Sequence, residues 1–507
     1  MASATAPVVL GIDLGTSSCK AVVFDLNGGV LASGRASYGL YRGANGAVEQ
    51  APEELWQGCV TASRAAMQSL PSNARVVGIG VCGAMPTHVF LASDGSVDPR
   101  AMIWMDARAH AEAQWLNEAV GAHELERAIG ARLPVTATMP PARMVWFAKH
   151  RPELLSGGHQ MLQAKDFINY RLTRVVATDH MSNLGLVNIR TRRPHLDYLS
   201  RLGVPSDLLP PAFEPFEIIG DVCPAAAREI GLAAGIPVAA GWLDSFCNML
   251  GTGLGTPGEA FDVAGTSEIL GMTAAAVSDP HPGILVLPLY EELSVVYGLT
   301  NAGADALRWC AEAFGLGDGP GGLRALDAEA AKADPGARGL VFLPYVSGER
   351  SPVWDDDATG VFFGCLRSHT RPEFARAVVE GLAHSVRQIL SLCAAAIGAP
   401  PSVVRASGGG TRSRFVNQVK ADVLGIPVVA MNSPETAALG AAMLAGIGCG
   451  LLTGYDDAVR TMTRESAVFE PHPELGSVYD DAHTVYEALY PALKDVKAAG
   501  SRKALLR

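Results

Sequence analysis

Short apolar runs at the start of the chain predict strands, and the longer segments between them have helical spacing. Residues 9–14 and 20–26 are rich in branched apolar side chains, and residues 30–40 predict a third strand. The pattern then predicts further strands at 75–84 and 236–241, a turn at 93–95, and helices at 52–69, 107–130, 141–150 and 245–251. This half therefore reads as an α/β unit that opens with a hairpin of strands.

The second half repeats the same order of elements. It again opens with strands, now at 259–264, 268–274 and 294–299, and a long helix follows at 372–397. A strand at 402–407 enters a glycine loop, and Phe415, Val419 and Val423 then give one apolar helix face. The remaining predictions are a surface loop at 315–322, a strand at 426–431 and an alanine-rich helix at 434–447.

Both halves together predict two α/β domains of related topology that meet near residue 250. We expect an N-terminal domain over residues 1–250, a C-terminal domain over 251–485 and a charged helical tail over 486–507. A length of 507 residues allows two or three domains of ordinary size.

Composition narrows the class of partner. The formal net charge is −11 and no run of Lys and Arg stands out, so we expect no nucleic-acid partner. The nine cysteines form no CxxC pair, which favours a reducing cytoplasm over a disulfide framework. The first residues lack a basic segment, and no apolar stretch reaches ~18 residues, so we expect neither a signal peptide nor a membrane span.

The tripeptide Gly-Thr-Ser occurs at the turn of each opening hairpin, at residues 15–17 and again at residues 265–267. A glycine lets the backbone come close to an anion, and the hydroxyl and N–H groups that follow can donate to phosphate oxygens. Two such turns on two halves of one chain predict a clamp for a polyphosphate.

Asp13 lies two residues before the first of these turns, at a predicted strand end. A carboxylate beside a phosphate loop can hold Mg²⁺ directly or through water. The alternative is an aspartate that bonds only its own turn. The second Gly-Thr-Ser turn favours the metal role.

Asp244 is the candidate general base. It follows the strand at 236–241 and stands at a helix start, where the commonest role of an aspartate is an N-cap. Its place near the predicted domain junction also lets it accept the proton of an alcohol that attacks a γ-phosphate.

Other segments carry weaker signals for a nucleotide or a sugar. The glycines of 407–410 and of 300–303 could lie along a nucleotide, although glycine loops before helices are common. Trp104, Asp106 and Arg108 place an indole, a carboxylate and a guanidinium close together, which suits a polyol. A core tryptophan beside a surface ion pair is the equally weighted alternative.

Two motifs of other enzyme classes are excluded. Residues 253–258 match GxGxxG, but Pro257 and a strand follow where a dinucleotide site needs a helix. The chain also has no GxxxxGK[ST] segment, so it is no P-loop enzyme.

Taken together, these residues resemble the FGGY family of carbohydrate kinases, within the actin-like ATPase superfamily. The resemblance runs from about residue 8 to residue 485. It rests on the order and spacing of GIDLGTSSCKAVVFD, AMIWMDARA, ARMVWFAKHRPE, the GWLDS aspartate, FDVAGTS, TNAGADALRW and SGGGTRSRFVNQVKADVLGIPV. The family implies two actin-like, ribonuclease H-like domains with ATP and Mg²⁺ in the cleft between them. It also implies transfer of the γ-phosphate to a hydroxyl of a sugar or polyol.

The resemblance assigns roles by position. Asp244 would be the catalytic base, Asp13 would assist Mg²⁺, and Trp104 would form a wall of the sugar pocket. The other residues that would contact the nucleotide are Gly15, Thr16, Ser17, Lys20, Gly265, Thr266, Gly303, Gly409 and Gly410, and those at the sugar are Met85, Asp106 and Ser245.

Departures from the family pattern lie in the substrate site. Glycerol kinases carry an Arg-Glu pair where this chain has Met85 and Pro86, which disfavours glycerol. Xylulokinases usually show Gln-Met-His-Gly where residues 84–87 read Ala-Met-Pro-Thr, and Asn where this chain has Ser245. The rest looks most like xylulokinase, so D-xylulose is the expected acceptor, with ribulose, erythritol and gluconate left open.

Two other classes of function compete with a sugar kinase. A non-metabolic actin-like ATPase would share the phosphate clamp but need no sugar pocket, and the segment around Trp104 argues against it. A dinucleotide oxidoreductase fails for lack of the strand–GxGxxG–helix context. A homodimer is an open alternative to a monomer.

Overall fold

The computed structural model describes residues 6–131, 135–156, 158–290, 293–432 and 435–499. The chain divides into two compact units, which we call the first unit (Met1–Gly253 with Glu435–Thr463) and the second unit (Leu254–Pro434 with Arg464–Arg507). The sequence placed residues 435–463 in the second half. The structure instead packs their helix α13 (Thr436–Gly448) on the sheet of the first unit.

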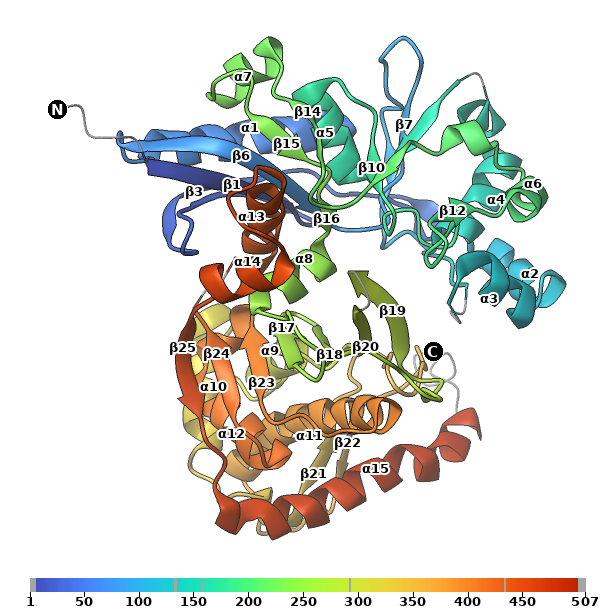
Figure 1. Ribbon diagram of the computed structural model, residues 1–507. Helices are drawn as coiled ribbons and strands as arrows, with labels where there is room; N and C mark the ends of the chain where they lie inside the picture. The colour runs from blue at the N-terminus through green and yellow to red at the C-terminus, as the bar shows by residue number, and fades with distance from the viewer. Residues whose placement is uncertain (1–5, 132–134, 157, 291–292, 433–434, 500–507) are drawn as a thin grey trace. The chain divides into compact units, whose positions relative to one another are not determined.

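The first unit is built on a seven-stranded mixed sheet (Figure 1). Strands β1 and β2 form the predicted antiparallel hairpin, and β6 lies parallel to β1 on its other side. Across the sheet the order is β14 (Ile218–Asp221), β15 (Pro237–Ala239), β6 (Ala74–Gly83), β1 (Ala6–Leu14), β2 (Ser18–Phe24) and β3 (Val30–Ser37), and β16 (Trp242–Leu243) also pairs with β6.

Helices cover the two faces of this sheet. The side chains of Leu10 and Ile12 point to the face that packs on helix α1 (Pro52–Ser69). Gly11 faces α13 instead, and a Cβ atom there would lie 1.9 Å from the carbonyl oxygen of Ala438. Because only glycine permits this close approach, α13 can lie directly on β1.

Smaller elements complete the first unit. They are β4 (Tyr41–Arg42), β5 (Val48–Gln50), β7 (Val89–Leu91), β8 (Ala101–Met102), β9 (Gln160–Leu162), β10 (Thr178–Asp179), β11 (Val187–Asn188), β12 (Arg193–Pro194), β13 (Ala212–Phe213), α2 (His110–Ala119), α3 (Ala122–Ile129), α4 (Pro140–His150), α5 (Ala164–Thr173), α6 (Leu196–Leu202), α7 (Pro224–Ile230), α8 (Asp244–Thr252) and α14 (Tyr455–Met462). Strands β5 and β8 pair with each other, which brings the segment around residues 48–50 beside the segment around residues 101–102.

The second unit repeats the plan of the first. Its hairpin β17–β18 is antiparallel, and β23 lies parallel to β17 as β6 does to β1. The sheet order is β19 (Leu285–Tyr290), β20 (Leu293–Thr300), β18 (Glu268–Ala274), β17 (Ala260–Ala264), β23 (Val404–Ser407), β24 (Val428–Met431) and β25 (Glu465–Phe469). The predicted pair of α/β domains with related topology is confirmed.

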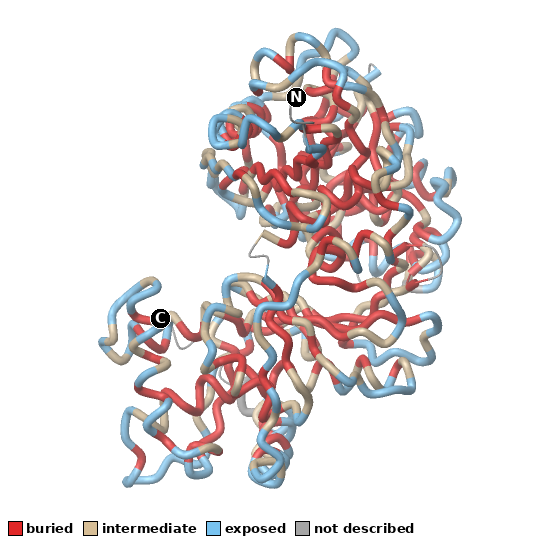
Figure 2. The backbone as a smooth tube through the Cα atoms, turned by 60° about the vertical axis from the view of Figure 1, so that its left-hand side comes forward, coloured by how far each residue is buried: buried red, intermediate tan, exposed pale blue. Residues whose placement is uncertain are grey.

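Helix α11 (Arg371–Ile397) packs on β18 and β20 of this second sheet, and α12 (Arg414–Leu424) packs on β24. The other elements of the second unit are α9 (Ala304–Ala313), α10 (Gly319–Ala330), β21 (Val341–Leu343), β22 (Val361–Phe363) and α15 (Gly476–Ala499). In Figure 2 the buried residues lie in the interior of each unit and the exposed ones on the loops around it.

Three further sequence predictions differ from the structure. The single helix at 107–130 is two helices, α2 and α3, because Gly121 breaks it with a φ of 80°. The surface loop at 315–322 ends early, since α10 begins at Gly319 with a proline in its first turn. Helix α15 runs continuously across residue 485, where the tail was expected to begin. Within the described ranges, no helix combines the length and the apolar character needed to cross a bilayer.

Candidate active site

The first Gly-Thr-Ser turn joins β1 to β2 and is held by neighbouring side chains. The N–H of Gly15 donates to the carbonyl of Ser18 at 3.1 Å, which closes the turn. The hydroxyl of Tyr38 donates to the carbonyl of Gly15, and the amide of Gln50 donates to the carbonyl of Thr16 at 2.6 Å. The carbonyls of Gly15 and Thr16 are therefore engaged, while the Ser17 residue of the turn is exposed.

Asp13 and Lys20 face each other across the β1–β2 hairpin, as their register requires. The Lys20 ammonium lies 3.7 Å from Asp13 Oδ2 and 2.7 Å from Glu435 Oε2. Burial raises the pKa of Asp13 more than the Lys20 charge lowers it, and Glu435 raises it further. Glu435 was not predicted, because it enters from just before α13, far along the chain from the hairpin.

Asp244 sits at the carboxyl end of the same sheet. Its strand β16 and strand β1 flank β6 on opposite sides, so that Asp13 and Trp242 both pair with Cys82. Strands β1 and β16 both end opposite Gly83, and Asp244 is the next residue after β16 and the first residue of α8. Its Oδ1 accepts the N–H of Ser245 at 2.6 Å.

Burial, with a further contribution from the charge of Asp13, raises the pKa of Asp244 to about 7. A carboxyl group with a pKa near the working pH is present as carboxylate and can also hold a proton, which is what a general base needs. The structure thus places the predicted base at the same sheet edge as the first Gly-Thr-Ser turn, within the first unit.

Trp104 reaches this loop from the segment after β8. Its indole Nε1 donates to the hydroxyl oxygen of Thr16 at 2.9 Å, and 40% of the residue is exposed. A flat apolar surface beside the loop is what the sequence predicted for a sugar wall. Trp104 is thus not the core tryptophan of the alternative interpretation.

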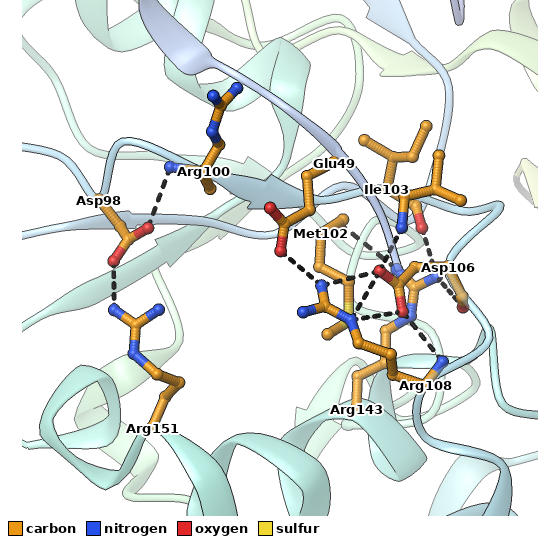
Figure 3. Close-up of polar contacts among 10 residues, drawn as sticks. Glu49, Asp98, Arg100, Met102, Ile103, Asp106, Arg108, Arg143 and Arg151 are labelled. Carbon is orange, nitrogen blue, oxygen red and sulfur yellow. Dashed lines mark hydrogen bonds and ion pairs between the residues drawn. The ribbon is translucent and has the colours of Figure 1, made fainter. Parts of the chain in front are cut away.

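Asp106 is fully buried and holds this segment in place (Figure 3). Its carboxylate accepts the N–H of Val48 at 2.8 Å and pairs with the guanidinium of Arg108, with Nε at 2.9 Å from Oδ2. Arg143, also buried, donates to the carbonyls of Ile103 at 2.5 Å and Asp106 at 3.1 Å. Both carboxylate oxygens are engaged, so the structure gives Asp106 a positioning role instead of the predicted sugar contact.

Met85 belongs to the same end of the sheet. The N–H of Ala84 donates to the carbonyl of Leu14 at 3.0 Å, which ties the segment after β6 to the end of β1. Thr87 N–H donates to Gln163 Oε1 at 2.7 Å, so the segment is also anchored at the start of α5. Met85 and Ser245 are both partly exposed at this edge, where the sequence placed sugar contacts.

The second Gly-Thr-Ser turn lies at the end of β17 in the second unit. Gly265 N–H donates to the carbonyl of Ser267 at 3.0 Å, so this turn also closes on its glycine, with one residue fewer than the first turn. The N–H groups at the start of α9 donate to the carbonyls of Gly265 and Thr266 at 3.0 and 3.1 Å. At Gly303 a Cβ atom would lie 2.6 Å from the carbonyl oxygen of Thr266, so this close packing needs a glycine.

The glycine loop after β23 meets the same turn. A Cβ atom on Gly410 would lie 2.6 Å from Cβ of Ala264, whereas one on Gly409 would meet nothing within 4 Å. The predicted nucleotide contacts of the second half are thus gathered at one edge of the second sheet. That this edge and the first turn hold the same nucleotide stays a prediction.

Comparison with known proteins assigns both halves of the chain to the same family. Residues 8–251 match the N-terminal domain of the FGGY family of carbohydrate kinases, and residues 261–449 match its C-terminal domain. A xylulose kinase from Staphylococcus epidermidis is 29% identical, with 97% of this chain and 98% of the relative covered.

Two further comparisons show the range of relatives. A gluconokinase from Bacillus subtilis is 28% identical, with 95% of this chain and 94% of that protein covered. The crystal structure of a xylulose kinase from Rhodospirillum rubrum superposes with a TM-score of 0.87 at 29% identity, covering 96% of this chain and 99% of that one.

Proposed function

The chain belongs to the FGGY family of carbohydrate kinases, and we propose that it transfers the γ-phosphate of ATP to a hydroxyl group of D-xylulose. The observation that carries the proposal is the placement of Asp244, whose raised pKa and position at the sheet edge put a proton acceptor beside the first phosphate turn. D-xylulose 5-phosphate and ADP are the proposed products.

Asp244 accepts the proton of the attacking hydroxyl as the new O–P bond forms. Phosphoryl transfer needs little covalent chemistry from the protein, so positioning and charge neutralisation supply most of the acceleration. Thr16, Ser17 and Lys20 are placed to contact the phosphate groups from the first turn. Exclusion of water from the acceptor side during transfer would protect the phosphate from hydrolysis.

Asp13 is the residue that fits Mg²⁺. It is a nearly buried carboxylate at the end of β1, two residues before the first turn, and its Lys20 partner stands 3.7 Å away. Among the described residues no group of three or more His, Cys, Asp or Glu side chains could hold a metal by itself, and Mg²⁺ in kinases commonly takes one or two carboxylates plus substrate phosphates. When bound, Mg²⁺ would neutralise charge on the phosphate oxygens.

The acceptor would lie against Trp104, with Met85 and Ser245 nearby. This side of the site combines an indole face with partly exposed small or apolar groups, which suits the C–H face of a ketose. The coverage of a whole xylulose kinase by this chain favours D-xylulose. Gluconate is the second candidate, because a gluconokinase is covered almost as completely at nearly equal identity.

The test is an ADP-release screen with D-xylulose, ribulose, gluconate, erythritol and glycerol as acceptors. We expect D-xylulose to give the highest kcat/KM, and the phosphorylated product to be identified by phosphorus NMR. A higher kcat/KM with gluconate would overturn the choice of acceptor. ATP turnover that ignores every acceptor would overturn the kinase itself and favour a non-metabolic ATPase.

A further inference from the structure

Lys420 of helix α12 is buried in the second unit with two carboxylates. Its ammonium lies 2.5 Å from Asp262 Oδ2 and 2.9 Å from Glu268 Oε1, and all three residues are at most 3% exposed. Asp262 lies on β17 and Glu268 begins β18. One lysine thus bonds both strands of the hairpin that carries the second phosphate turn.

The same lysine also links that hairpin to the glycine loop. Helix α12 begins directly after residues 408–413, and its first turn is capped by the Ser413 hydroxyl, which accepts the N–H of Val416 at 3.0 Å. Asp262 stands three residues before Gly265, and Glu268 follows Ser267 directly. Lys420 therefore connects the two loops at which the nucleotide contacts of this unit are gathered.

The cluster holds two carboxyl groups and a single ammonium group. Asp262 Oδ1 and Glu268 Oε2 are buried with no hydrogen-bond partner among the described residues. Burial and the charge of Asp262 raise the pKa of Glu268 to about 8, with Lys420 lowering it and Glu349 raising it. Buried ion clusters contribute little net stability, but removing one partner leaves the others uncompensated.

We propose that Lys420 is a positioning residue for the nucleotide, which holds the turn at 265–267 against the glycine loop at 408–410 through its bonds to Asp262 and Glu268. The inference rests on the proposed function, because it assumes that these two loops contact the phosphates. Sugar binding takes place in the first unit, so loss of Lys420 should weaken nucleotide binding and leave acceptor binding unchanged.

The test uses Lys420→Met in the full chain, with KM measured for ATP and for the acceptor and the Kd of ADP measured by calorimetry. We expect KM for ATP and Kd for ADP to rise roughly 10–100-fold, the range typical of residues that orient a first shell of contacts. KM for the acceptor should not change. Lys332→Met is the matched control and should behave as the wild type, because the Lys332 side chain is 61% exposed although it also pairs with a carboxylate, that of Glu329.

A second variant keeps the test decisive if Lys420→Met does not fold. Glu268→Gln preserves the Lys420–Asp262 pair and removes only the charged link to β18, so it should raise the Kd of ADP several-fold. A merely structural defect would instead raise both KM values together.

The two hypotheses fail in different ways. If the wild type is an active kinase and both variants bind ADP as it does, the role of Lys420 is wrong and the proposed function stands. If the wild type phosphorylates no acceptor but binds ADP, and the variants lose that binding, the kinase proposal fails and the role of Lys420 stands.

Discussion

Replacing Asp106 by Asn removes the charge that holds the Trp104 segment in place. The Asp106 side chain is fully buried, and it accepts the N–H of Val48 and pairs with Arg108, whose side chain is only 17% exposed. In the variant, an amide NH₂ must face one of these donors, and the Arg108 guanidinium keeps only Glu49 as a carboxylate partner. The change is close to isosteric, so its effect reports the charge and the hydrogen bonds.

The expected cost follows from burial. Removing one partner of a buried ion pair costs about 3–5 kcal/mol. For a unit of this size about 1 kcal/mol corresponds to roughly 2–4 °C in Tm, so the transition of the first unit should fall by about 6–20 °C. KM for the acceptor should rise as well, because Trp104 loses the support that sets its distance from Thr16.

The measurement is thermal unfolding of Asp106→Asn beside the matched variant Asp98→Asn (Figure 3). Asp98 also pairs with an arginine, at 2.6 Å, but the side chain of its partner Arg151 is 42% exposed. Such pairs are worth about 0.2–1 kcal/mol, so Asp98→Asn should lower Tm by no more than about 4 °C. Equal decreases in Tm for the two variants would refute the reasoning that burial of the ion pair sets the cost.

Two further predictions concern stability. Gly11→Ala should lower the free energy of unfolding by more than the ~1–3 kcal/mol usual for overpacking, because its Cβ would lie 1.9 Å from the Ala438 carbonyl oxygen. The control is Gly476→Ala, whose Cβ would meet nothing within 4 Å, and it should leave the urea midpoint unchanged. Equal midpoints would contradict the packing of α13 on β1. Burial lowers the pKa of His384 to about 3 and of His483 to about 4, so the unfolded chain binds more protons and stability should fall as pH drops from about 6.5 toward 4. Replacing both by Gln should reduce the Tm difference between pH 7 and pH 5, and an unchanged difference would refute the assignment.

The elements that could be predicted from the sequence are those set by local pattern. The hairpins β1–β2 and β17–β18 follow from short apolar runs around a Gly-Thr-Ser turn, and the repeat of this order indicated two related units. The shared edge of Asp13 and Asp244 is a finding of the structure, in which parallel strands on both sides of β6 end together.

Contacts between segments that are distant in the chain could not be predicted, because they leave no pattern in the local sequence. Nothing in the local sequence links Lys20 to Glu435, or Lys420 to the hairpin it bonds, because these pairings depend on how helices pack on each sheet. The role of Asp106 was missed for a related reason. Its burial depends on β5 pairing with β8, which brings the Val48 N–H to its carboxylate.

The central claim is that Asp244 takes the proton of the attacking hydroxyl, and the most direct measurement is kcat of Asp244→Asn with the Kd of ADP measured in parallel. We expect kcat to fall by roughly 10²–10⁴-fold while ADP binding is unchanged, because the carboxylate acts on the acceptor and not on the nucleotide. Asp221→Asn, at an exposed aspartate that ends β14, is the control and should retain wild-type kcat. Wild-type turnover in Asp244→Asn would contradict the account.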